Sequence, residues 1–335
     1  MPVGQGVLRP LFQGRGHYES RGPRGESSNG GPGMSLTERY SAAVDRTLRL
    51  RDGRQVGFAT FGDVDGLPVF YMHGSFGSRL EGRIGHAAAL GRHVRLIALD
   101  RPGFGLSDPH AGARLADWPL DLDEIADQLG LERFSMLGVA GGGAFALAAA
   151  ARLPKRVRAV ALISPTAPHD RRGVLAGMDL RARIFVHLLP RWAPRLLLRL
   201  QKRAARLADR DPQALLREAS GTLPASERPV FMSPEIAEIF MEATYEGFRS
   251  GPEGMVRELV LLARPWGFPL EAVDAPAFLW HGETDRVSPV AMSHVLAREL
   301  AKSQLQTIPD RGSAIAVQVV PDAIATLAAW ARQSD

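Results

Sequence analysis

The chain has 335 residues, 45% of them hydrophobic and 23% charged, as in a soluble protein built around one large core. Its lack of cysteine excludes disulfides, thiolate zinc sites and cysteine nucleophiles. The net charge of +5 comes with no nucleic-acid-binding motif, so a nucleic-acid partner is not expected. No apolar run long enough to span a bilayer and no secretory signal is visible, so the expected location is cytoplasmic.

Residues 1–33 stand apart from the rest of the chain. They are rich in Gly, Arg and Pro and have little apolar surface to bury, so we expect this segment to be disordered. Two explanations stay open: a start codon assigned upstream of Met34, or a basic arm that contacts a partner.

From residue 46 onward, strand patterns alternate with helix patterns. Asp52-Gly53 lies between two alternating runs in TLRLRDGRQVGFATFG, which predicts a β-hairpin. Helices are predicted at residues 79–90 and 121–129. Further strands are predicted at PVFYMHG, VRLIALD, FSMLGV, VRAVALIS, PAFLWHG and LQTIP. Continuously apolar strands that alternate with helices are typical of a mostly parallel sheet covered on both faces, so the predicted fold class is α/β.

The strand pattern stops between Ser164 and Pro276. Helical segments are predicted there, at residues 180–208, 233–249 and 252–263. The predicted organisation is a core of residues 34–165 and 275–335 with a helical lid at 166–274. Such an insertion lies over the crevice at the carboxyl edge of the sheet, where ligands bind in folds of this class. The basic, leucine-rich part of it also fits a membrane-surface helix, but the flanking helices favour a lid.

The stretch FSMLGVAGGGAFALAAAARLP, residues 134–154, carries the main functional signal. A buried strand, a glycine-rich turn and an alanine-rich helix form the setting in which hydrolases present a nucleophilic serine in the pattern Gly-x-Ser-x-Gly. Here the pattern is Gly138-Val139-Ala140-Gly141-Gly142, so a methyl group stands where the nucleophile is expected.

Five stretches in the expected order carry a family resemblance: YMHGSFGSR, ALDRPGFGLSD, LGVAGGGAFALA, LWHGETDRVSP and IPDRGSAIAV. Over residues 46–332 the chain resembles the α/β-hydrolase family, most closely its lid-bearing esterase, peptidase and epoxide-hydrolase-like branch. The resemblance implies a nucleophile position at Ala140, an acid position at Asp285 and a histidine position at Ser313. Two of the three triad positions are therefore substituted, and only the acid is retained.

The resemblance also implies an oxyanion site. Its donors would be the backbone N–H of Gly141, after the elbow, and that of Ser75 or Phe76, after Gly74. Other polar residues nearby have simpler structural interpretations. Hydrogen bonding within a turn or helix capping accounts for His73, Ser75 and Ser78. His281 is expected to be a structural residue at the end of a strand. Asp100 is expected to organise its own loop.

Loss of the nucleophile or the histidine of a serine hydrolase costs about a million-fold in turnover. The first interpretation is therefore a non-hydrolytic protein that binds a small acyl or ester-like ligand, or a partner, under the lid. The alternative is a hydrolase of ester, amide or epoxide bonds that uses Asp285 and water. A third is a scaffold whose pocket is vestigial. No metal-ligand spacing or phosphate-binding loop is visible, so no cofactor is expected, and the oligomeric state stays open.

Overall fold

The structure of the protein, a computed structural model, describes residues 45–208, 212–221 and 223–333. The disorder expected for residues 1–33 lies outside these residues. The remaining fold predictions fall almost entirely within them.

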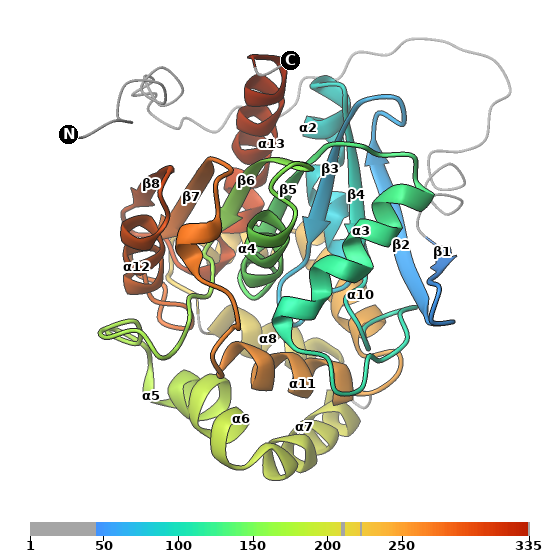
Figure 1. The fold of residues 1–335 in the computed structure, drawn as a ribbon. Helices are drawn as coiled ribbons and strands as arrows, with labels where there is room; N and C mark the ends of the chain where they lie inside the picture. The colour runs from blue at the N-terminus through green and yellow to red at the C-terminus, as the bar shows by residue number, and fades with distance from the viewer. Residues whose placement is uncertain (1–44, 209–211, 222, 334–335) are drawn as a thin grey trace, which may run out of the picture.

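A single sheet of eight strands runs through the described part of the chain, in the order β1-β2-β4-β3-β5-β6-β7-β8 (Figure 1). The first two pairings, β1 with β2 and β2 with β4, are antiparallel, and all the others are parallel. The mostly parallel α/β fold is therefore confirmed. The strands are β1 (Arg46–Arg49), β2 (Gln55–Gly62), β3 (Leu67–Met72), β4 (Val94–Leu99), β5 (Phe134–Val139), β6 (Val157–Ile163), β7 (Ala277–Gly282) and β8 (Ser303–Ile308).

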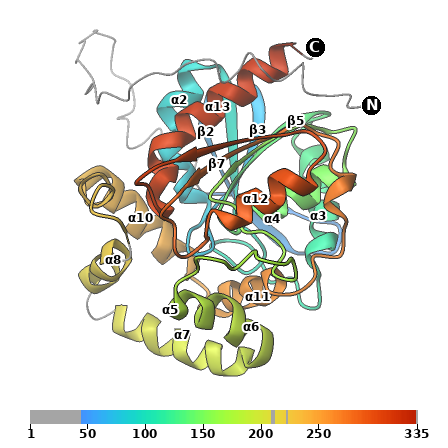
Figure 2. The ribbon, with the colours of Figure 1, turned by 90° about the vertical axis from the view of Figure 1, so that its left-hand side faces the viewer.

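The sheet is covered by helices on both faces because its inner strands alternate between two cores. In β3, Phe70 and Met72 belong to one core cluster, whereas Val69 and Tyr71 belong to the other. Figure 2 shows α2 and α13 on one side of the sheet and α3, α4 and α12 on the other. The helical segments of the core are η1 (Arg79–Gly85), α2 (His86–Gly91), η2 (Leu115–Asp117), α3 (Trp118–Gln128), α4 (Gly142–Arg152), α12 (Ala291–Glu299), η5 (Ser313–Ile315) and α13 (Ala316–Gln333).

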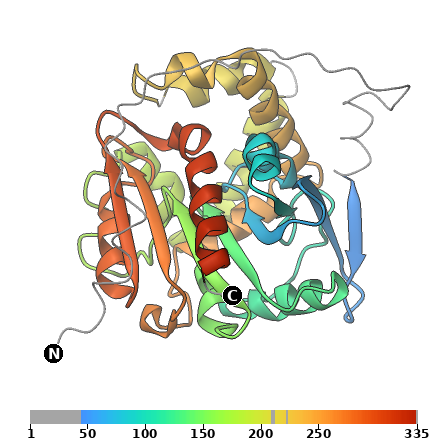
Figure 3. The same cartoon turned by 90° about the horizontal axis from the view of Figure 1, so that it is seen from above.

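Both edges of the sheet differ from its centre, and Figure 3 shows them on opposite sides of the molecule. At one edge the predicted hairpin is confirmed, with Arg49 opposite Gln55 and Gly53 at a φ of 90° in the turn. At the other edge β8 is only half-buried, whereas its sequence had been interpreted as an apolar, buried strand. Gln306, which is exposed, accounts for part of the difference, because a strand with one neighbour can leave polar side chains near water.

A helical insertion separates β6 from β7. The predicted helix at residues 180–208 is interrupted, because Pro194 cannot continue the preceding hydrogen-bond ladder and starts a new helix instead. The insertion contains α5 (Leu180–Ala182), η3 (Arg183–Leu188), α6 (Leu189–Trp192), α7 (Pro194–Ala208), α8 (Pro212–Gly221), α9 (Arg228–Phe231), α10 (Pro234–Gly247), α11 (Glu253–Leu262) and η4 (Leu270–Ala272).

Side chains of the insertion reach the loops that follow the strands at their carboxyl ends. Glu246 of α10 accepts a 2.6 Å hydrogen bond from Arg79, after β3. Glu258 of α11 pairs at 2.6 Å with Arg101, after β4. Glu227 accepts a bond from the backbone N–H of Ala314, after β8. The insertion is therefore tied to the edge of the sheet where the candidate site lies (Figure 1).

The segment Ser313–Gln333, which includes α13, is long and apolar enough to cross a membrane by length and composition alone. In the structure its apolar residues pack against the sheet. Val319, Val320, Ala323, Ile324 and Leu327 are all buried in the core cluster that also contains Tyr71. Packing in the protein core thus accounts for the apolar character of this helix.

Candidate functional site

The turn between β5 and α4 keeps the backbone geometry of a nucleophile elbow. Ala140 has a φ of 46°, in the left-handed region that residues other than glycine rarely adopt. Its N–H donates to Ile163 at 2.9 Å, and its carbonyl accepts from Gly143 and Thr166 at 3.1 Å each. These bonds hold the strained residue in place. The turn therefore presents a side chain at the carboxyl edge of the sheet, but that side chain is a methyl group.

Close packing of the helix on the sheet depends on one glycine of this turn. A Cβ atom at Gly142 would lie 2.2 Å from the backbone oxygen of Met72 in β3. Only glycine lets the start of α4 approach the neighbouring strand so closely. The glycine-rich pattern around Ala140 is thus explained by packing, whether or not a nucleophile is present.

Backbone donors are available at the expected oxyanion position. Among the described residues, the N–H groups of Ser75, Phe76 and Gly141 have no hydrogen-bond acceptor. Gly74 differs, because its N–H donates to the carboxylate of Glu81 at 3.0 and 3.1 Å. Gly74 therefore shapes the loop, and the three later donors are the ones left for a ligand.

The space above Gly141 is narrow. A Cβ atom at this position would lie 2.2 Å from Ser75 Oγ and 3.0 Å from both Glu258 and Leu262 of α11. Ala140 and Ser75 are nevertheless half-buried, and Phe76 is 43% exposed, so solvent reaches this edge. A cavity of about 490 Å³ lies elsewhere, bordered by Arg79 and α10. The space beside Gly141 is therefore occupied largely by Ser75, Glu258 and Leu262.

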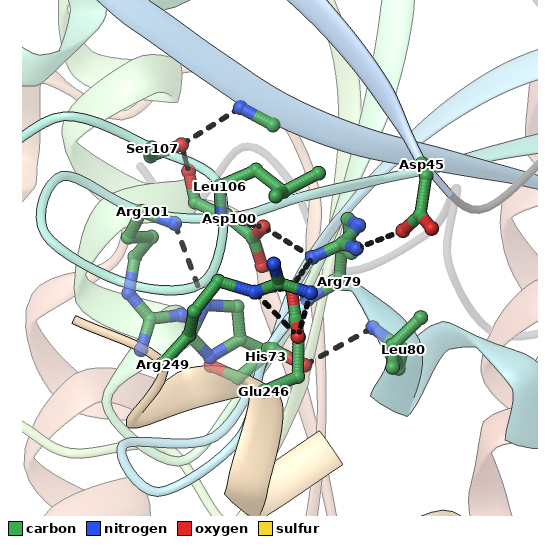
Figure 4. Close-up of polar contacts among 12 residues, drawn as sticks. Asp45, His73, Arg79, Leu80, Asp100, Arg101, Leu106, Ser107, Glu246 and Arg249 are labelled. Atoms are coloured by element: carbon green, nitrogen blue, oxygen red, sulfur yellow. Dashed lines mark hydrogen bonds and ion pairs between the residues drawn. The ribbon is translucent and has the colours of Figure 1, made fainter. Parts of the chain in front are cut away.

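Buried polar groups hold the two loops beside the elbow (Figure 4). The Arg101 guanidinium pairs with Glu258 at 2.6 Å and also donates to the carbonyl of His73. The His73 ring contacts the Gly74 carbonyl at 2.7 Å, and burial lowers its pKa well below the usual value. His73 Nε2 accepts a bond from the backbone N–H of Arg101 at 3.4 Å, so this neutral, fully buried imidazole joins the loop after β3 to the loop after β4 (Figure 4).

Asp100 and Ser78 have similar local roles. The Asp100 carboxylate accepts bonds from the backbone N–H groups of Arg79 and Leu106 at 2.7 and 2.9 Å, and it pairs with the Arg79 guanidinium at 2.8 Å (Figure 4). The Ser78 hydroxyl accepts a bond from Leu80 and caps η1. Both side chains are fully committed to loop structure, as the sequence had suggested.

Asp285, at the acid position, lies in the loop after β7 with one oxygen bonded and one unpaired. Its Oδ1 accepts from Val287 and Ser288 at 2.8 and 2.9 Å. Its Oδ2 has no hydrogen-bond partner among the described residues. Burial raises the pKa of this carboxyl to about 7, and the nearby Glu227 adds to the shift. The unpaired oxygen is the atom that would orient a histidine in a complete triad.

His281, the histidine that the structure places beside Asp285, does not take the missing place. His281 Nε2 lies 3.9 Å from Asp285 Oδ2, beyond hydrogen-bond distance. This nitrogen instead donates to the Ser288 carbonyl at 2.6 Å, and Nδ1 accepts from the Ser293 hydroxyl at 2.7 Å. Burial lowers the pKa of His281 to about 4. His281 is therefore a neutral structural residue.

Ser313, at the histidine position, starts η5 and is half-buried. The structure brings its loop next to Asp285, since Thr284 N–H donates to the Arg311 carbonyl at 2.9 Å. Glu227, which the sequence analysis missed, reaches this loop from the insertion and is only 1% exposed. It belongs to no motif, so nothing in its local sequence marked it as a site residue.

Comparison with family models matches residues 68–316, about three quarters of the chain, to the family described as alpha/beta hydrolase fold. The chain belongs to the α/β-hydrolase fold family. This α/β-hydrolase has a mostly parallel sheet and a left-handed turn at Ala140 after the fifth strand.

Curated relatives match only part of this α/β-hydrolase. A segment of 118 residues is 35% identical to the dihydrolipoyllysine-residue acetyltransferase component of the acetoin cleaving system of Cupriavidus necator, covering 31% of each chain. A segment of 76 residues is 41% identical to 2-hydroxy-6-oxo-2,4-heptadienoate hydrolase of Pseudomonas putida, covering 22% of this chain and 28% of the relative. The matches thus span about a third or less of these relatives.

Solved structures match over most of the chain. An esterase from Exiguobacterium antarcticum superposes with a TM-score of 0.65 at 19% identity, covering 86% of this chain and 99% of the esterase. A thermophilic esterase from Thermogutta terrifontis gives a TM-score of 0.60 at 23% identity, covering 86% and 96%. At such identities the likeness establishes the fold and leaves the reaction open.

Proposed function

We propose that this α/β-hydrolase is a non-hydrolytic member that binds a small acyl or ester-like ligand beneath its helical insertion, which would act as a lid. The observation that carries the proposal is the methyl group of Ala140 on an otherwise intact, left-handed elbow. A methyl group has no lone pair with which to attack a carbonyl carbon. The serine at position 313 supplies no base, because a serine hydroxyl is neither protonated nor ionised near neutral pH.

Two observations support binding at this place. The N–H groups of Ser75, Phe76 and Gly141 lack acceptors among the described residues. Gly141 also lies where α4 begins, with the Ser75 side chain beside it, and the positive end of a helix dipole attracts an anion or a polarised carbonyl oxygen. The crowding around Gly141 limits the bound group to a small one.

A second candidate is favoured by one observation, the pKa of about 7 for Asp285. A carboxyl group that exchanges its proton near neutral pH is suited to general acid–base catalysis. In this alternative the protein would hydrolyse an ester, amide or epoxide bond with water in place of the serine. The two candidate functions differ in whether the bound ligand is released unchanged or is hydrolysed.

A screen with short activated esters and a simple epoxide separates the candidates. The native protein is compared with Asp285→Asn and with Glu283→Gln, a matched change at an exposed carboxylate of the same loop. We expect the rate with each protein to equal the rate in buffer, while the ester's NMR signals broaden on binding. Turnover by the native protein that Asp285→Asn abolishes and Glu283→Gln preserves would overturn the proposal.

A further inference from the structure

A small cavity lies between the loop that follows β4 and two helices, α3 and α11. Its volume is about 30 Å³, and roughly 10–15 Å³ is enough for one water molecule, so the cavity can hold about two oxygen-sized atoms. His110 and Arg257 in its wall are half-buried and Arg114 is exposed, so solvent reaches it. Neither Ser75 nor Ala140 borders this cavity, which is therefore separate from the elbow.

Most of the charged groups in the wall already have a counter-charge. The ion pairs are Arg101 with Glu258 at 2.6 Å, Arg54 with Asp121 at 2.6 Å, Arg114 with Asp117 at 3.0 Å and His110 with Asp121 at 3.6 Å. The two carboxylates that border the cavity, Asp121 and Glu258, are thus each bonded to an arginine. Neither of them is left to balance a further cation.

Arg257 of α11 is the exception. Its guanidinium forms no ion pair among the described residues, and it donates one long hydrogen bond, of 3.3 Å, to the Ala113 carbonyl. Burial lowers the pKa of this guanidinium, and no carboxylate raises it, whereas Asp117 raises the pKa of Arg114. Arginine keeps its charge at neutral pH. A half-buried positive charge therefore borders the cavity without a counter-charge.

The rest of the wall is mainly apolar. It includes Pro102, Phe145, Leu261 and the ring of Trp118, which packs edge-to-face on Phe145 with 5.7 Å between the ring centroids. The Trp118 indole N–H is buried and has no acceptor among the described residues. Arg257 and Trp118 are both hydrogen-bond donors, so the side chains that lack a full set of partners here call for an acceptor.

A carboxylate fits this cavity better than a phosphate group does. The planar fork of a guanidinium matches the two oxygens of a carboxylate. A phosphate group carries more oxygens and more charge, and the apolar wall offers it few donors. Space for about two oxygen-sized atoms also matches a carboxylate, whose hydrocarbon part can lie against the apolar side chains.

We propose that Arg257 forms a binding site for a small monocarboxylate in the cavity between α3 and α11. This site goes beyond the function proposed above and does not depend on it, because it uses none of the backbone donors of the elbow. Glu258 lies between the two places, since it borders the cavity and a Cβ atom at Gly141 would lie 3.0 Å from its Oε1. The carboxylate therefore neutralises Arg257 beside the elbow but outside it.

An NMR titration of the full chain with acetate tests this site. Acetamide is the matched probe, since it has nearly the same shape and no charge. We expect acetate to bind roughly tenfold more tightly than acetamide and to shift the indole N–H signal of Trp118, which Trp118→Phe identifies by its loss. Arg257→Gln should weaken acetate binding about tenfold. Arg264→Gln, at an exposed arginine just after α11, should bind acetate like the native protein.

Two further variants separate the charge from the space. Arg257→Lys keeps the charge but lacks the planar fork, so its affinity for acetate should lie between those of the native protein and Arg257→Gln. Ala113→Leu keeps the arginine and places a larger side chain in the wall of the cavity, so it should weaken acetate binding about tenfold.

Equal binding of acetate and acetamide, or no acetate-dependent shift of the Trp118 signal, would overturn the site. Unchanged acetate binding in Arg257→Gln and Ala113→Leu variants that retain the native NMR spectrum would also overturn it, and a folding failure in one of them leaves the other as the test. A loss in Arg264→Gln as large as that in Arg257→Gln would show that acetate responds only to the positive charge of the protein, which rejects the site as well.

Discussion

At the residue scale, Asp285 illustrates how one lost neighbour changes the chemistry of another residue. In a complete triad its outer oxygen would face an imidazolium that favours the ionised carboxylate. Here that oxygen has no partner and Glu227 lies nearby, so burial dominates and the pKa rises to about 7. The carboxyl group is therefore half-protonated near neutral pH.

This shift has a consequence for stability. A pKa raised in the folded state stabilises the protein below the unfolded value of 3.8, and that stabilisation is lost as pH rises through about 7. We expect the native protein to lose about 4 kcal/mol relative to Asp285→Asn between pH 4 and pH 8, from a shift of roughly three units. The Asn amide oxygen can still accept the bonds from Val287 and Ser288.

Urea unfolding of both proteins at several pH values measures this prediction. The difference between the two curves isolates Asp285, because the buried histidines titrate in both proteins. A difference in unfolding free energy that stays constant from pH 4 to pH 8 would show that Asp285 has an ordinary pKa.

At the element scale, a buried ion pair links the insertion to the edge of the sheet. Arg101 is fully buried and Glu258 of α11 is 3% exposed, at a distance of 2.6 Å. The same guanidinium donates to the carbonyls of His73 and Gly74, so one side chain connects α11 to the oxyanion loop. A second pair on α11, between Lys202 and Glu253, is about half-exposed and offers a matched comparison.

We expect Glu258→Gln to lower the free energy of unfolding by about 3–5 kcal/mol, because it leaves a buried guanidinium without its counter-charge. Glu253→Gln should cost about 0–1 kcal/mol, as is usual for an exposed pair. Urea unfolding of the two variants at neutral pH compares them directly. Equal losses from the two substitutions would mean that the Arg101–Glu258 pair does not fasten the insertion.

At the scale of the whole molecule, the features that could be predicted from the sequence are those that a short, continuous stretch of residues determines. Asp52-Gly53 identified the hairpin, and continuous apolar runs identified the strands of the parallel sheet. The elbow and acid loops could be placed because the family's motifs are contiguous in sequence. The places of Ala140 and Asp285 at the ends of two strands therefore follow from the sequence alone.

Contacts between distant segments could not be predicted in this way. Glu227 belongs to no motif and reaches the histidine loop only because the insertion folds back over the sheet edge. The pairing of Arg101 with Glu258 likewise joins a core loop to an insertion helix. The break in the predicted helix at residues 180–208 occurs at Pro194. The regular pattern of leucines and arginines continues on both sides of this proline, so the pattern alone predicted one continuous helix.

In the function proposed above, the scaffold of a hydrolase remains and only its nucleophile and its base are missing. The most direct measurement is ester hydrolysis by Ala140→Ser, Ser313→His and the double variant. We expect turnover in the double variant alone, because a nucleophile without its base, or a base without its nucleophile, loses almost all of the catalytic effect. Hydrolysis by the native protein, or a correctly folded double variant with no turnover, would contradict it.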